Sequence, residues 1–166
     1  MAQTRAGMAK MTTPSGPPAF RQLAHHEAEA ILQRNHVGRM AFTLHDRVDI
    51  EPINYIFTDG WLYGRTSHGT KLGILAHHQW IAFEVDEVSG PFDWHSLVIK
   101  GRFEVIPADL SKAHAPAFTK ALELVRQLAP DAWKEHDRVA FRNVLFRIHI
   151  DEIIGREATT THTPTE

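Results

Sequence analysis

The segment from Leu62 to Leu75 carries the residues best suited to hold a phosphate group. Arg65 can pair with an anion through two parallel N–H groups, and Lys71 supplies a compact positive charge. Thr66 and Ser67 add hydroxyl groups between them. If a short helix follows, its first amides also point toward a bound anion. The spacing matches neither GxxxxGK(S/T) nor GxGxxG, so a hairpin end with a solvated helix start is the alternative interpretation.

A second group of polar residues occupies positions 51–55. Pro52 interrupts a run of β-forming residues, removes one ladder donor and implies a strand edge or a bulge. Asn54 and Tyr55 place an amide and a phenol on opposite faces of that strand. Two interpretations stay open here: an edge bulge with Asn54 in solvent, or a backbone segment laid against a flat heterocycle.

A third group lies in the long run 94–106. Trp94 and Ser96 share one face of a strand, and Gly101 permits a close approach or curvature. Tryptophan at such a position is more often a core or interface residue than a ligand platform. This group alone therefore assigns no function.

The hydrophobic pattern predicts which elements position these groups. Alternation favours strands at 38–44, 48–57, 61–65, 80–88, 94–106 and 144–150, with turns at 45–47 and 58–60. Helical spacing favours a short helix around 28–32, another after Gly69, and a longer one over 109–136 that Pro116 starts or kinks. Because strands follow one another without helices over 38–66, the prediction is a mainly β domain with flanking helices. We expect six strands, mostly antiparallel, that form a small closed or split β-barrel.

Composition sets the limits of the ordered domain and its environment. Residues 1–19 and 158–166 are rich in Thr, Pro and small residues, which predicts a disordered arm and tail around a domain at 20–157. The absence of Cys fits a reducing compartment, so we expect a cytoplasmic protein. No apolar run is long enough to cross a membrane or to serve as a secretion signal.

Charge and histidine content exclude two further classes of partner. With a formal net charge of -2 and 18 Lys and Arg residues spread along the chain, we expect no nucleic-acid partner. The 12 His residues include the adjacent pairs 25–26 and 77–78, which point in different directions on a helix. Without an HxxxH motif they predict surface or interface histidines and no metal site.

The order of the motifs resembles the pyridoxamine-phosphate oxidase-like, flavin-binding split-barrel family. Within that family the nearest branch includes the nitroimidazole-resistance reductases. The resemblance covers residues 20–157, and its specificity lies in the succession of motifs. The motifs are Gly38–Ala41, Pro52–Tyr55, Leu62–Thr66 with Gly69 and Lys71, Ala82–Asp86 and Trp94–Arg102.

The resemblance implies a six-stranded split barrel that forms a homodimer, with one FMN in each of two clefts at the subunit interface. It implies phosphate contacts from one segment, ring contacts from a second and an approach to the same cleft from a third. The phosphate contacts would be Arg65, Thr66, Ser67 and Lys71. The ring contacts would be Ile53, Asn54 and Tyr55, and the third segment contributes Trp94 and Ser96. The nitroimidazole-resistance branch often has His where this chain has Arg65. The expected phosphate contact does not change, but nitro reduction is not assigned to this chain.

The implied activity is an FMN-dependent oxidoreductase in which NAD(P)H or another donor reduces the flavin. A nitro compound, a quinone or oxygen would then accept the electrons. Since the flavin itself takes up hydride, no catalytic acid or base is assigned. Three alternatives remain: a flavin-binding protein or sensor without turnover, a deazaflavin-using barrel and a haem-binding barrel.

Overall fold

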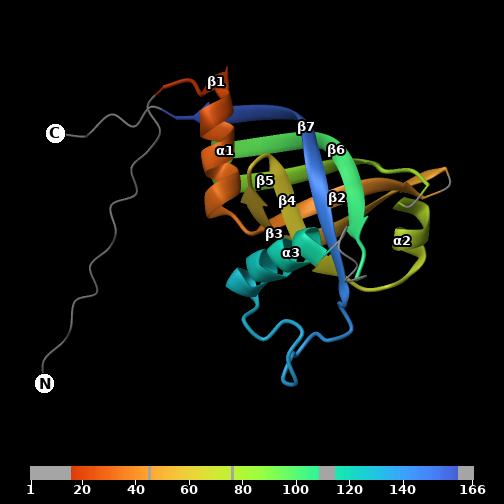
Figure 1. Cartoon of the computed structure of the whole chain (residues 1–166). Helices are drawn as coiled ribbons and strands as arrows, with labels where there is room; N and C mark the ends of the chain where they lie inside the picture. Colours follow the sequence, from red (N-terminus) through yellow and green to blue (C-terminus); the bar gives the residue numbers. More distant parts are fainter. Residues whose placement is uncertain (1–15, 45, 76, 109–114, 161–166) are drawn as a thin grey trace, which may run out of the picture.

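The strands form a barrel with helices at its ends and side (Figure 1), in a computed structural model that describes residues 16–44, 46–75, 77–108 and 115–160. Within these residues the strands are β1 (Ala19–Gln22), β2 (Val37–Leu44), β3 (Arg47–Thr58), β4 (Trp61–Thr66), β5 (Trp80–Gly90), β6 (Asp93–Ile106) and β7 (Val144–Thr159). The helices are α1 (His25–Arg34), α2 (Thr70–Leu75) and α3 (Ala115–Leu128). The predicted class, mainly β with flanking helices, is confirmed.

Six of the described strands close into one antiparallel ring in the order β7-β4-β3-β2-β5-β6, because β6 pairs back with β7. These are the six strands that the sequence predicts. A seventh strand, β1, adds to β7 outside the ring, with Ala19 opposite Thr159. The six-stranded barrel is therefore confirmed, but the sheet has one strand more than predicted. Because all four residues of β1 are exposed, no buried-exposed alternation marks it in the sequence.

The ordered pairing extends slightly beyond the predicted domain of 20–157. Ala19 lies in β1, and Ala158 and Thr159 lie in β7, so the tail predicted from residue 158 starts later. The rest of the predicted arm and tail, at 1–15 and 161–166, lies outside the described residues. So do His45 of the predicted turn at 45–47 and the predicted helical residues 109–114.

The long predicted helix is shorter in the structure. Pro116 occupies the first turn of α3, where its missing N–H costs little. The helix ends at Leu128 instead of near residue 136, and turns follow over 130–134. Pro130 explains the early end, because proline disfavours helical geometry in the residue before it.

The barrel opens between β3 and β4. Asp59 and Gly60 join these strands in a turn with φ of 52° and 75°, the left-handed values of a type I′ hairpin. The pairing then runs only from Thr58 opposite Trp61 to Tyr55 opposite Gly64. The first part of β3, residues 47–54, pairs with β2 alone. Pro52 lies in this free edge, as its missing donor predicts.

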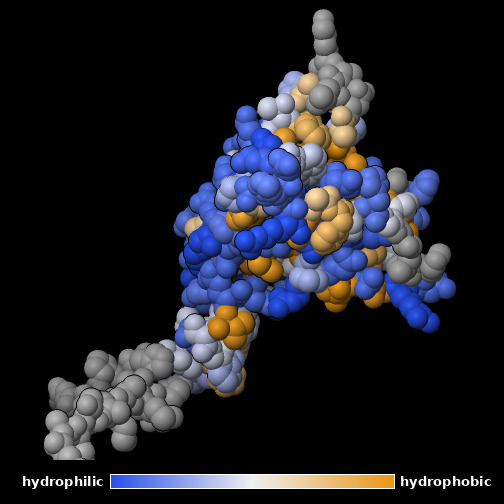
Figure 2. All heavy atoms as spheres, turned by 90° about the horizontal axis from the view of Figure 1, so that it is seen from below, coloured by the Kyte–Doolittle hydropathy of each residue, from blue (hydrophilic) through white to orange (hydrophobic). Residues whose placement is uncertain are grey.

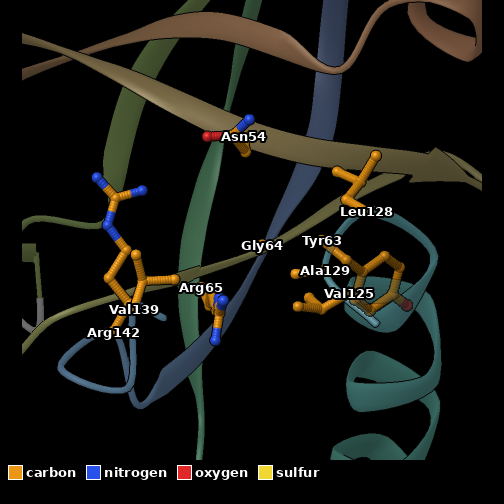
Figure 3. Close-up of a pocket in the computed structure, with 9 residues that line it drawn as sticks. All are labelled: Asn54, Tyr63, Gly64, Arg65, Val125, Leu128, Ala129, Val139 and Arg142. Atoms are coloured by element: carbon orange, nitrogen blue, oxygen red, sulfur yellow. The ribbon is translucent and has the colours of Figure 1, made fainter. Parts of the chain in front are cut away.

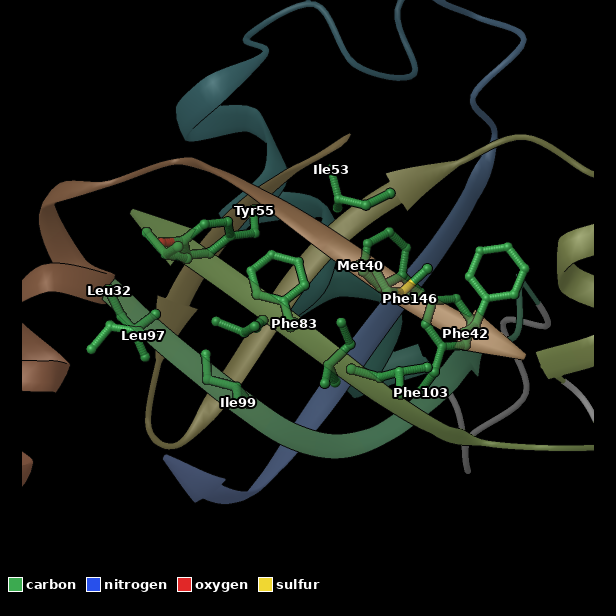
Figure 4. Close-up of a cluster of buried hydrophobic side chains, with 14 of the residues drawn as sticks. Leu32, Met40, Phe42, Ile53, Tyr55, Phe83, Leu97, Ile99, Phe103 and Phe146 are labelled. Atoms are coloured by element: carbon green, nitrogen blue, oxygen red, sulfur yellow. The ribbon is translucent and has the colours of Figure 1, made fainter. Parts of the chain in front are cut away.

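Two hydrophobic clusters hold the barrel together. The larger fills the barrel interior, where aromatic side chains from several strands meet (Figure 4). Phe103 and Phe146 stack there with ring centroids 4.9 Å apart. The smaller cluster lies between α3 and β4, around Tyr63, Val125 and Leu145. On the outside, the face seen in Figure 2 is mostly hydrophilic, with separate hydrophobic areas.

Close packing also explains Gly101, which the sequence marks as a point of curvature. The pairing of β6 with β7 shifts register between Lys100 and Gly101. A Cβ atom at Gly101 would lie 2.2 Å from the backbone oxygen of His149. Only glycine therefore fits at this bend of β6.

Tyr55 is a polar residue inside the larger cluster. Its side chain is fully buried, and its ring meets Phe83 edge to face with centroids 5.3 Å apart. Among the described residues, the Tyr55 hydroxyl has no hydrogen-bond partner. Burial also raises the pKa of the Tyr55 phenol, so the hydroxyl stays protonated at neutral pH.

We expect Tyr55→Phe to raise the free energy of unfolding by about 1 kcal/mol, because it removes a buried hydroxyl that has no partner. Urea denaturation would measure this change. Tyr63→Phe is the matched control, because the Tyr63 hydroxyl is not a buried group without a partner and its removal should bring no gain in stability. A clear loss of stability in Tyr55→Phe would contradict the prediction.

Candidate functional site

The link between β4 and α2 presents hydrogen-bond donors that the rest of the described chain does not use. Thr66 ends β4 opposite Val144, and its side chain is buried. Among the described residues, the N–H groups of Ser67, His68 and Gly69 donate to no backbone carbonyl, and the Ser67 hydroxyl has no partner. A Cβ at Gly69 would meet no heavy atom within 4 Å. Successive free amides beside open space are suited to an oxyanion.

Lys71, in the first turn of α2, forms an ion pair with Glu51 of β3. The Lys71 side chain is 14% exposed, whereas the Glu51 side chain is 38% exposed. This contact places the ammonium group beside the free edge of β3. Because Glu51 can turn toward solvent, an incoming anion can replace it as the partner of Lys71.

The sequence suggests a free guanidinium at Arg65, but in the structure this guanidinium already has a partner. It forms two hydrogen bonds with the carboxylate of Asp137, at 2.6 and 3.1 Å. Both side chains are nearly buried, at 9% and 5% exposure. The guanidinium carbon also lies 5.8 Å from the centre of the Trp133 ring. Arg65 therefore fastens the loop 129–143 to β4.

Asp137 organises that loop. Its carboxylate accepts hydrogen bonds from the backbone N–H groups of Trp133 and Val139, each at 3.1 Å. Arg65 first, and then these two amides, lower the pKa of Asp137 from its ordinary 3.8 to about 2. Trp133 has φ of 59°, a left-handed value that is uncommon outside glycine. A satisfied charge thus holds a strained loop in one conformation.

The strand β3 turns its residues alternately inward and outward along the free edge. Asn54 is exposed, and its neighbours Ile53 and Tyr55 are core residues. The side chains of Ile53 and Tyr55 therefore do not face a surface cleft, and only their backbone groups are available there. The predicted separation of Asn54 and Tyr55 onto opposite faces is confirmed.

A cavity of about 230 Å³ lies between this edge, β4 and α3 (Figure 3). Its apolar walls come from α3 and the residue after it, from β4 and from the loop 129–143. Its polar groups are Asn54, Arg65 and Arg142. The remaining lining residues are Tyr63, Gly64, Val125, Leu128, Ala129 and Val139. The structure thus brings Asn54 and Arg65 to one cavity, directly before the link at 67–69.

Trp94 and Ser96 lie elsewhere in the chain. Trp94 is opposite Ala158 near the end of β7, whereas Thr66 is opposite Val144 at its beginning. These positions are about 45 Å apart along the strand at about 3.3 Å per residue. Trp94 instead meets Phe20 of β1, with ring centroids 6.3 Å apart, beside a separate groove of about 610 Å³. One chain does not unite all the predicted site residues.

Sequence reasoning missed three residues that shape this region. Glu51 stands in the 51–55 group, but nothing in the sequence pairs it with Lys71. Asp137 and Arg142 lie in a segment without periodicity, more than 70 residues from Arg65. No local pattern marks such long-range contacts.

Two other kinds of feature are absent from the described residues. They contain no group of three or more His, Asp or Glu side chains placed to hold a metal ion. None of the helices formed by these residues has the length and apolar character needed to span a membrane.

Comparisons with known proteins identify similar chains. Residues 24–157 match the family described as pyridoxamine 5′-phosphate oxidase. A FAD-binding protein from Mesorhizobium loti is 27% identical, with a TM-score of 0.67 over 86% of this chain and 99% of that one. A Corynebacterium glutamicum protein, provisionally named a pyridoxamine 5′-phosphate oxidase, is 27% identical, with a TM-score of 0.60 over 87% and 96% of the two chains. These neighbours confirm the split-barrel fold.

A more distant neighbour carries the name of the predicted branch. It is a Bacteroides thetaiotaomicron protein provisionally named a 5-nitroimidazole antibiotic resistance protein. The two chains are 16% identical, with a TM-score of 0.63 over 85% of this chain and 89% of that one. At this identity the similarity shows the shared fold alone.

We expect Asp137 to make the protein more sensitive to acid. Its folded-state pKa is lowered, so its stabilising effect is complete above the ordinary value of 3.8 and disappears as the pH falls toward about 2. The wild type should therefore lose more unfolding free energy than Asp137→Asn between about pH 4 and pH 2. Chemical denaturation at each pH would measure both curves.

Asp131→Asn provides the control in the same loop. The Asp131 side chain is 65% exposed, and its ion pair with Lys134 is long, at 4.0 Å. It should follow the wild-type curve. Parallel curves for the wild type and Asp137→Asn would contradict the role given to Asp137.

Proposed function

Since the chain belongs to the pyridoxamine 5′-phosphate oxidase family, we propose that it is an FMN-dependent oxidoreductase that passes electrons from NAD(P)H to a small-molecule acceptor. The observation that carries the proposal is the set of free donors at 67–69 with Lys71, placed beside the open edge of β3. The family predicted from the order of motifs is confirmed by the match over residues 24–157.

The phosphate of FMN would bind at the link between β4 and α2. A terminal phosphate carries close to two negative charges at neutral pH and accepts several hydrogen bonds. The amides of Ser67, His68 and Gly69 and the Ser67 hydroxyl supply neutral donors, and Lys71 supplies charge. Arg65 would act mainly by fixing the loop 129–143, since Asp137 already holds its guanidinium.

The flavin ring would lie along the free edge of β3. Residues 47–54 have no strand partner on that side, so their outward backbone groups can meet the polar rim of a heterocycle. Asn54 adds an exposed amide at the end of this edge. Ile53 and Tyr55 would contribute backbone groups, while their side chains hold the strand in the core.

The bound flavin would supply hydride and electron transfer, so the protein needs only to bind and orient it. The side chains that line the cavity include no Asp, Glu, His or Lys among the described residues. This composition agrees with a site that positions reactants and excludes water. It offers no carboxylate or imidazole there as a general acid or base.

We propose FMN in preference to FAD because the donor set fits a terminal phosphate. In FAD the corresponding phosphate is linked to a second one and carries less charge per group. The M. loti neighbour is named a FAD-binding protein, so the two flavins have to be compared directly on this chain. Heat release of the native cofactor followed by chromatography would identify it.

A homodimer would complete the site. Trp94 and Ser96 lie far along β7 from Lys71 in the same chain, so a second copy would have to bring them to the cleft. The outer face of β3 and β5 carries exposed apolar side chains suited to such a contact. These are Val48 and Ile50 of β3 and Trp80 and Ala82 of β5. A face of this kind favours self-association.

We expect Lys71→Ala to raise the Kd for FMN by about 5- to 150-fold, equivalent to about 1 to 3 kcal/mol for a lost charge-assisted contact. Riboflavin, which lacks the phosphate, should bind both proteins equally. Quenching of flavin fluorescence during titration would measure each Kd.

Lys134→Ala is the matched control, because Lys134 is a half-exposed lysine whose nearest carboxylate is 4.0 Å away. It should bind both flavins like the wild type. Equal FMN affinity in Lys71→Ala and the wild type would place the phosphate elsewhere.

Mixing two defective variants would test whether each cleft uses both chains. Lys71→Ala and Trp94→Ala should each bind FMN weakly. After subunit exchange, about half of the dimers are mixed and each contains one intact cleft, so about a quarter of the native tight sites should return. If one chain formed the whole cleft, mixing would restore none.

An anaerobic titration separates an enzyme from a passive flavin binder. NADH or NADPH should bleach the flavin absorbance of the enzyme, and added acceptor should restore it. A protein that stays yellow with both donors would be a flavin-binding protein or sensor. A Soret band would instead identify haem.

A further inference from the structure

The cavity beneath Asn54 has one charge that nothing in the described chain neutralises. Arg65 and Arg142 both line it. Arg65 is satisfied by Asp137. Arg142 is half-buried, and no described carboxylate lies within ion-pair distance of it. Its guanidinium carbon lies 5.9 Å from the ring of Phe141, and its backbone N–H donates to Val139.

The direction of Arg142 makes that charge available. Figure 3 shows its side chain rising from the loop before β7 toward β3, where Asn54 lies, while the Arg65 guanidinium points away toward the loop. The backbone hydrogen bond to Val139 and the pairing of Val144 with Thr66 fix the loop on both sides of Arg142. The backbone from which the Arg142 side chain extends is therefore fixed beside the cavity.

The other walls are apolar. Val125 and Leu128 of α3, the following Ala129 and the ring of Tyr63 lie on the side away from Arg142 (Figure 3). The volume of about 230 Å³ is below the range of about 300–1,000 Å³ that holds drug-sized ligands. A molecule with one ring and one charged group matches both the size and the lining.

We infer that this cavity binds a small aromatic or conjugated monocarboxylate, with Arg142 pairing the carboxylate and Asn54 contacting it from β3. A carboxylate fits one guanidinium through two parallel hydrogen bonds. The ring would pack against Val125 and Leu128. This inference rests on the proposed function in one respect: the ligand would lie beside the flavin edge and so represent the substrate class of the enzyme.

Benzoate and benzamide are suitable probes, because they share size and shape and differ in charge. Calorimetric titration of the full-length protein should give a Kd for benzoate at least about tenfold lower than for benzamide. Arg142→Gln should abolish this preference, and Arg142→Lys should retain part of it. Arg138→Gln, an exposed arginine in the same loop that does not line the cavity, should keep it in full.

Methyl NMR spectra would locate the ligand independently of affinity. Benzoate should shift the methyl signals of Val125, Leu128 and Val139 in the wild type. Equal affinity for the two probes, an unchanged preference in Arg142→Gln, or shifts confined to other residues would each overturn the inference.

Flavin titrations of the same samples keep the two proposals separate. Benzoate binding with no flavin binding would remove the proposed function and leave the carboxylate site standing. Flavin binding with no preference for benzoate would overturn the carboxylate site alone.

Discussion

The early end of the pairing between β3 and β4 is the constraint on which the site depends. The two strands separate after Tyr55 and Gly64, because β4 continues along β7 while β3 continues along β2. Gly64 lies at the fork, where a Cβ would come within 2.8 Å of the backbone oxygen of Asn54. Beyond it, one strand leads to the donors at 67–69 and the other presents a free edge. A fully paired barrel would leave neither group available.

The cations around this fork differ in how completely they are neutralised, and this difference separates their roles. Arg65 and Asp137 form a nearly buried bidentate pair, and breaking such a pair leaves a buried charge without a partner. That pair therefore has a structural role. Lys71 pairs with a carboxylate that reaches solvent, so its partner can change at low cost. Arg142 has no carboxylate partner in the described chain, which leaves its charge for a ligand.

The sequence predicts those parts of the molecule that depend on local patterns. Alternation located the six strands of the ring, Asp59-Gly60 marked the hairpin, and Pro52 marked the free edge. β1 escaped because its four exposed residues gain their order from β7, more than 130 residues away. Distant contacts also explain why the structure differs from the prediction for Arg65. Its residue type favours an anion, but only the fold shows that Asp137 is that anion.

The position of Trp94 and Ser96 shows the same limit and is the basis for proposing a second chain. Their residue types suggest contact with the same ligand as Lys71, yet β7 separates the two groups within one chain. A conformational change could not bring them together, because β6 pairs with β7 from Trp94 to Ile106 and the ring would have to open. A two-fold axis solves this without any change in the barrel, since it places the distant end of one chain beside the cleft of the other. A site that includes both Lys71 and Trp94 would therefore require a second copy of the chain, which supports the proposed homodimer.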